Sequence, residues 1–318
     1  MTKSIFDDVK NYWNFAPFEC YANSLLSLLK LWNVDPTLFF AQYWFLSYDR
    51  LLLSAKHPRL NYLEDYYNLE YRFFISHNHT IVDSLDEGAA VMLYCDTKSL
   101  YYYPHDYTGG ADFGLMHFII IYGYDSDQQL FSVLDPTVDF IGTLSYGDVD
   151  KLIAEVENQI FVRVKKTPAT RPVENKVEFF KRSSRQSYLL YHLAEQNCGM
   201  RAPERFIADL DVCESWEGSL WDNWTLYNCV SLTSIIKNRS AIWNGLEKIG
   251  VLTPSQLEKC HELYVSIAKD WNSLSFLMTK FRMKKDFKLV GNLKTKLLAV
   301  QKDESSLLDE LYRIGKSL

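Results

Sequence analysis

"GLMHFIIIYGYDSDQQLFSVLDPT", residues 114–137, decides how the first part of this chain folds. Short runs rich in Val, Ile, Tyr and Phe, bounded by Gly, Asp and Pro, are typical of strands. We therefore predict strands over 116–125 and 130–137, joined by a hairpin turn at DSDQ (125–128). His117 lies at the start of the first strand, where an imidazole is either a buried core histidine or a catalytic base.

The segments around this hairpin predict the rest of a first domain. "AAVMLYCD" (89–96) and "QIFVRVKK" (159–166) have strand patterns, and "GDVDKLIAEV" (147–156) predicts a short helix. Leucines at helical spacing predict a helix that begins at or just after Cys20. A helix followed by strands indicates the α+β class, with the N-terminal helix packed on an antiparallel sheet.

The second half of the chain has a helical pattern. Pro, Thr and charged residues at 167–176 predict a linker between a first domain, 1–166, and a mainly α-helical C-terminal domain, 177–318. Thr253 as N-cap and Pro254 at the first helical position predict the start of one long helix there. Within the first domain, the aromatic-rich segment 36–53 is also expected to be helical.

Composition limits the classes of function. The chain has 318 residues, a formal net charge of -6 and no long Lys/Arg block, so we expect neither nucleic acid nor a membrane surface as a partner. The N-terminus has no apolar signal segment, which favours the cytoplasm. The six cysteines have no paired spacing, so the sequence predicts no metal site, no disulfide framework and no cofactor.

Three residues form a candidate catalytic set. A cysteine at a helix N-terminus, such as Cys20, has its thiolate favoured by the helix dipole and by unsatisfied backbone N–H groups. Asp135 ends the strand after the one that carries His117, so it can reach the imidazole from a neighbouring strand. Taken singly, Cys20 is more often a buried thiol, and Asp135 a strand-ending turn residue. Asn14 is a candidate second oxyanion donor, or a surface asparagine.

Other residues could line a pocket next to this set. Asp96 and Tyr103 lie in or near the Tyr-rich segment after the 89–96 strand, and Asp112 lies in the Gly-rich segment before His117. An aromatic cover over the core is the commoner role for such tyrosines, and Asp112 is equally well a plain loop residue. His77 and His79 lack a third metal ligand, so we interpret "SHNH" (76–79) as a solvated turn.

Several motifs in register carry a family resemblance. The stretch "LDEGAAVMLYCDTKSLYYYPHDYTGGADFGLMHFIIIYGYDSDQQLFSVLDPT" (85–137) resembles the butirosin-biosynthesis BtrH-like acyltransferases, and the similarity covers most of 15–165. That family is similar to papain-like cysteine peptidase domains that cut bacteriocin leader peptides. The resemblance implies a Cys-His-Asp triad in which Cys20 is acylated, His117 is base and acid, and Asp135 fixes the imidazole. Glu19 and Met116 replace small residues usual in the family, so the pocket is expected to differ.

The residues and the resemblance lead to one expected function and two alternatives. We expect a cysteine-dependent acyltransferase of bacterial secondary-metabolite (antibiotic) biosynthesis, which moves an acyl group from an acyl carrier protein or other thioester to an amine or alcohol of a small molecule or peptide. "KNR" (237–239) or "KFRMKKDFK" (280–288) could receive the acidic carrier. The alternatives are a cysteine peptidase or thioesterase, and a catalytically silent protein that binds a peptide or carrier. The oligomeric state stays open, with a homodimer as one alternative.

Overall fold

A computed structural model shows an α+β protein whose contacts divide it into two compact units. The structure describes residues 2–14, 20–41, 44–49, 51–55, 67–75, 78–104, 116–156, 160–168, 175–193 and 197–318. The first unit comprises Met1–Pro36 and Leu60–Val173, and the second comprises Thr37–Arg59 and Glu174–Leu318. We call them the sheet unit and the helical unit.

The sheet unit contains a seven-stranded antiparallel sheet in its described residues. Its order is β4 (Leu69–Ile75), β9 (Ile160–Lys166), β5 (Ala90–Asp96), β6 (Met116–Asp125), β7 (Leu130–Asp135) and β8 (Phe140–Ser145), and β1 (Thr2–Ser4) pairs with the end of β6. The predicted strands of the opening stretch are confirmed, with a turn at 126–129 between them, and β7 ends at Asp135.

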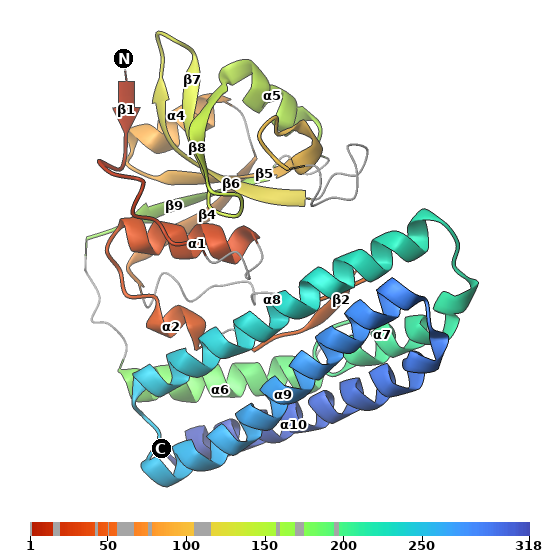
Figure 1. The fold of residues 1–318 in the computed structure, drawn as a ribbon. Helices are drawn as coiled ribbons and strands as arrows, with labels where there is room; N and C mark the ends of the chain where they lie inside the picture. The colour runs from red at the N-terminus through yellow and green to blue at the C-terminus, as the bar shows by residue number, and fades with distance from the viewer. Residues whose placement is uncertain are drawn as a thin grey trace. The chain divides into compact units, whose positions relative to one another are not determined.

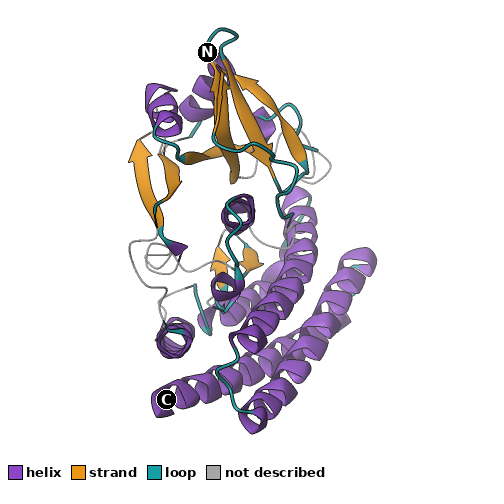
Figure 2. Cartoon of the chain, turned by 90° about the vertical axis from the view of Figure 1, so that its left-hand side faces the viewer, coloured by secondary structure: helices purple, strands orange, loops and turns teal. Residues whose placement is uncertain are grey.

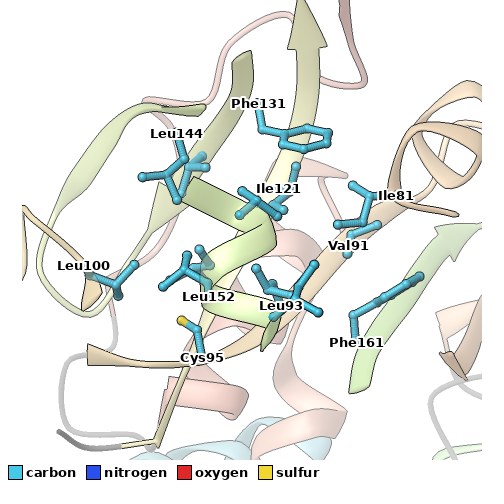
Figure 3. Close-up of a cluster of buried hydrophobic side chains, with 14 of the residues drawn as sticks. Ile81, Val91, Leu93, Cys95, Leu100, Ile121, Phe131, Leu144, Leu152 and Phe161 are labelled. Carbon is cyan, nitrogen blue, oxygen red and sulfur yellow. The ribbon is translucent and has the colours of Figure 1, made fainter. Parts of the chain in front are cut away.

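Helices cover both faces of this sheet (Figure 1). Helix α1 (Cys20–Leu31) packs on one face, and α4 (Asn78–Asp86) and α5 (Tyr146–Ala154) pack on the other. Because successive strand residues point to opposite faces, odd-numbered residues of β5, of β7 and of β6 as far as Ile121 meet α4 and α5, and the register shift after Ile121 brings Tyr124 onto the same face. Figure 3 shows the resulting core, with strand residues such as Leu93, Cys95 and Ile121 close to Ile81 of α4 and Leu152 of α5.

Long helices lying side by side make up most of the helical unit (Figure 2). They are α6 (Lys176–Leu193), α7 (Arg201–Val212), α8 (Ser219–Ile249), α9 (Pro254–Lys284) and α10 (Val290–Ser317). The predicted start of α9 is confirmed, because the Thr253 side chain accepts the Gln256 N–H while the Gln256 side chain accepts the Thr253 N–H. No described helix is both long and apolar enough to cross a membrane.

The helix expected over 36–53 is wrong. This segment forms the short helix α2 (Thr37–Phe40) and then an antiparallel hairpin of two strands, β2 (Ser47–Asp49) and β3 (Leu52–Ser54). Leu51, between the two strands, has a positive φ of 65°. Asn228 of α8 binds this hairpin, since its Oδ1 accepts the Leu53 N–H and its Nδ2 donates to the Leu51 carbonyl. Tertiary contacts therefore hold the segment in the helical unit rather than in the first domain as we expected.

Candidate functional site

Strand geometry places His117 and Asp135 on the same face of the sheet. Ile121 of β6 pairs with Val133 of β7, so Asp135 and His117 lie further along the two strands at positions of the same parity. His117 Nε2 lies 2.8 Å from Asp135 Oδ2, and the two side chains are 3% and 0% exposed. A buried imidazole thus has a carboxylate partner that fixes its orientation.

The Asp135 carboxylate has further donors around it. The Thr137 N–H donates to Oδ1 at 3.0 Å, and the Tyr102 hydroxyl lies 3.4 Å from Oδ2. Asp135 therefore makes the turn contact expected of a strand-ending Asp-Pro and contacts the histidine as well. Because a buried polar group is costly unless hydrogen-bonded, these donors offset part of the cost of burying this group.

Cys20 is the first residue of α1, and its thiol is half-buried. Two contacts fasten α1 in place: Ser24 Oγ donates to the Phe118 carbonyl at 3.5 Å, and Ser27 Oγ donates to the Trp13 carbonyl at 2.6 Å. The Cys20 side chain is hydrogen-bonded to the His117 imidazole. Since Asp135 contacts Nε2, Nδ1 is the ring nitrogen that remains for the thiol.

The surroundings of His117 favour its protonated form. Burial by itself lowers the pKa of His117, but the Cys20 thiolate charge and hydrogen bonds to Asp135 and Cys20 outweigh it, with the Asp135 charge adding to them. Together, these effects raise the pKa of His117 from 6.5 to about 10. A protonated imidazole beside a cysteine can act as a general acid in cysteine-dependent catalysis.

The start of α1 also offers donors for a developing oxyanion. The Cys20 N–H belongs to the first turn, whose N–H groups have no partner within the helix, and the first turn of α1 carries no acidic side chain. Asn14 is exposed, next to Trp13, whose carbonyl Ser27 binds. Its role as the second oxyanion donor stays a prediction.

The remaining predicted pocket residues have different placements. Asp96 caps the 3-10 helix Thr97–Ser99, since its Oδ1 accepts the Lys98 N–H at 3.0 Å. Tyr103 is 8% exposed, and its ring contacts the His117 ring edge-on, with the two ring centroids 5.2 Å apart. Tyr103 therefore covers the histidine, whereas Asp112 lies outside the described residues.

At "SHNH" (76–79) the sequence predicts a solvated turn and no metal site. His77 lies outside the described residues, and the described side chains contain no group of three or more His, Cys, Asp or Glu that could hold a metal ion. Asn78 begins α4, so the part of "SHNH" that the structure describes belongs to a helix rather than a turn.

The two basic segments differ in how many cations they expose. In "KNR", Lys237 is exposed, but Arg239 is 1% exposed and its Nε lies 2.7 Å from Glu304 Oε1, so this segment offers a partner one cation rather than a basic patch. In "KFRMKKDFK", by contrast, Arg282, Lys284, Lys285 and Lys288 are exposed at the end of α9 and just beyond it.

The sequence did not reveal the roles of Tyr102 and Thr137 as partners of Asp135. The Asp-x-Thr spacing at 135–137 is a local signal for the Thr137 contact, because Asp side chains bind backbone N–H groups two residues on. The Tyr102 contact links residues 33 positions apart and has no such signal.

No family model matches the chain, and no curated protein matches it in sequence.

Proposed function

We propose that this protein is a cysteine-dependent acyltransferase with a papain-like sheet unit, in which Cys20 is the nucleophile, His117 the base and acid, and Asp135 the orienting group. The observation that carries this proposal is the buried His117–Asp135 pair, with the half-buried Cys20 at a helix start hydrogen-bonded to the same imidazole. A helix-borne cysteine facing a histidine and an aspartate on strands is the papain-like arrangement.

The first half-reaction takes the acyl group from a thioester. The Cys20 thiolate attacks the acyl carbon and forms a new C–S bond, and the Cys20 N–H helps to hold the oxyanion. Collapse of the tetrahedral intermediate breaks the bond to the donor sulfur. The imidazolium of His117 gives its proton to that departing thiolate, leaving acyl-Cys20 and a neutral imidazole.

The second half-reaction passes the acyl group to an amine or alcohol. Neutral His117 takes a proton from the attacking acceptor while its nitrogen or oxygen bonds to the acyl carbon. The Cys20 thiolate then leaves, and the imidazolium–thiolate pair is restored. Water in place of the acceptor turns the same steps into thioester hydrolysis. Peptide hydrolysis also needs a peptide bond in place of the thioester, with the His117 proton going to the leaving amine.

The proposed donor is an acyl carrier protein, which is acidic. The segment 280–288 carries five basic side chains and one acidic side chain on a chain whose net charge is -6. Met283, 79% exposed, lies among these cations and adds an apolar contact. A basic surface with an exposed methionine fits an acidic protein partner through charge and apolar contacts together.

Intact-protein mass spectrometry tests the proposal. The protein is incubated with a panel of acyl thioesters and then given an amine, and we expect a mass increase on the chain that disappears as the amide forms. Cys20→Ala should show no adduct, whereas Cys95→Ala, which removes a thiol that is fully buried, should be acylated like the parent.

Other results would decide against acyl transfer. An adduct on Cys20 that water releases while the amine gains no acyl group would make the protein a hydrolase. Absence of any adduct, together with binding of a peptide or carrier, would make it a silent binding protein.

A further inference from the structure

The Tyr102 hydroxyl and the His117 imidazole share one oxygen of Asp135. The hydroxyl lies 3.4 Å from Oδ2, and His117 Nε2 lies 2.8 Å from the same atom. The other carboxylate oxygen accepts the Thr137 N–H at 3.0 Å. All of these contacts lie within the sheet unit.

Packing fixes the position of the Tyr102 ring independently of the carboxylate. The ring stacks on Phe140 with centroids 3.6 Å apart and planes 2° from parallel. Phe140 is the cross-strand partner of Asp135 in the β7–β8 ladder, so the stacking surface and the carboxylate belong to the same pair of residues. The Tyr103 N–H donates to the Leu100 carbonyl at 3.0 Å, which closes the turn that presents Tyr102.

We propose that Tyr102 is a positioning residue, which holds Asp135 Oδ2 against His117 and so keeps the imidazole aligned with Cys20. A carboxylate with one oxygen held by Thr137 can still tilt its other oxygen away from the imidazole. A hydroxyl on a rigid, stacked ring restricts that motion. This role deepens the proposed acyl transfer and rests on it.

Tyr102 remains a donor across the whole working range of pH. Burial, followed by the nearby negative charge of Asp135, raises the pKa of Tyr102 far above its usual range. The hydroxyl therefore keeps its proton beside the carboxylate, and its hydrogen bond does not titrate together with the imidazole.

Groups from several elements act on His117. Cys20 of α1 and Asp135 of β7 raise its pKa, and Cys95 of β5 lies directly opposite it in the ladder with Tyr103 against its ring. Burial, and then the charges of Asp135 and Cys20, raise the pKa of Cys95, so this thiol stays neutral at ordinary pH. Of these contributions to the pKa of His117, a change at Tyr102 alters the one that depends on the alignment of Asp135.

Tyr102→Phe tests the proposal because it keeps the stacked ring and removes only the hydroxyl. We expect the titration midpoint of His117, followed by NMR of its ring nitrogens, to move to lower pH, because a tilted carboxylate stabilises the imidazolium less. We also expect kcat for acyl transfer to fall by roughly 3- to 10-fold with KM little changed, as for the loss of one hydrogen bond. The NMR titration needs no substrate, so it stands even where the acyl-transfer assay fails.

Tyr101→Phe is the matched control. Tyr101 is 71% exposed, its ring also contacts Phe140, and its hydroxyl lies 3.4 Å from the Thr143 carbonyl rather than near Asp135. This variant should keep the parent midpoint and kcat. An unchanged midpoint in Tyr102→Phe would overturn the proposal. A midpoint moved to higher pH would also overturn it, because the hydroxyl would then compete with the imidazole for Oδ2 instead of aligning it.

Discussion

Cys95 lies directly opposite His117 in the β5–β6 ladder, yet the proposed nucleophile is Cys20 on a helix. Cys95 is fully buried among aliphatic side chains, and burial raises its pKa well above the usual range (Figure 3). Cys20 is half-buried, begins a helix and is hydrogen-bonded to the imidazole. Proximity to the histidine alone therefore does not identify the reactive thiol.

The difference between these cysteines predicts selective alkylation. Iodoacetamide at neutral pH should modify Cys20 at least about 10-fold faster than Cys95, because the thiolate is the reacting form and must be accessible. Peptide mapping after a short exposure measures both sites in one sample. In denaturant the two cysteines should react at similar rates. Equal modification of both in the native protein would contradict this assignment.

The loss of the His117 proton should set the upper pH limit of acyl transfer. The departing thiolate needs a proton from the imidazolium, which is lost as the pH rises through about 10. Since the folded-state pKa is raised from 6.5, the same protonation stabilises the fold fully below pH 6.5, and this contribution is lost as the pH rises through about 10. We expect kcat/KM to fall at that limit, whereas alkylation of Cys20, which needs no acid, should continue.

Asp135→Asn should move that limit to lower pH. The substitution keeps the shape of the side chain and removes the charge that helps to raise the pKa of His117. Loss of correct general acid–base catalysis should lower kcat by roughly 10²- to 10⁴-fold. A pH–rate profile of parent and variant measures both effects. Asp139→Asn, in the turn that follows β7, is the control; an Asp135→Asn profile that matches it would remove Asp135 from the mechanism.

The strands that carry the site could be predicted because their information is local. The run from Met116 to Asp125 is mostly apolar and aromatic, is bounded by turn residues and is largely buried on both faces of the sheet. Helix α1 could be predicted because its leucines repeat at helical spacing. For Cys20 and His117, the sequence shows only their order along the chain. The register of the sheet was needed to show which side chains share a face.

Other elements have no clear local signal. Strand β8 reads FIGTLS, and its central Gly142 and part-exposed residues make a weak strand pattern. The β2–β3 hairpin is held by Asn228, which lies more than 170 residues further along the chain. The expectation for 36–53 was wrong because aromatic residues fit helix and strand patterns alike, and a distant partner decided between them.

Charge reversal tests carrier docking at the end of α9. Lys284→Glu with Lys285→Glu should raise KM for a carrier-bound acyl donor by about 10-fold or more at low salt, since exposed charges mainly steer association. Turnover of a small acyl thioester should not change. Lys269→Glu with Lys302→Glu, at exposed sites elsewhere in the helical unit, is the control with the same change in net charge. Equal effects of the two pairs would show that net charge acts and that 280–288 is no docking surface.

The helical unit should depend strongly on one buried ion pair, Arg239–Glu304. The two side chains are 1% and 0% exposed, and Glu304 Oε1 also accepts the Trp271 Nε1–H at 2.9 Å. Glu304→Gln leaves the buried guanidinium without a counter-charge, so we expect the free energy of unfolding to fall by about 3–5 kcal/mol. Lys181→Ala breaks an exposed pair with Glu178 and should cost less than about 1 kcal/mol. Urea unfolding monitored by tryptophan fluorescence compares the two variants, and a Glu304→Gln protein as stable as Lys181→Ala would mean that the pair contributes little to the fold.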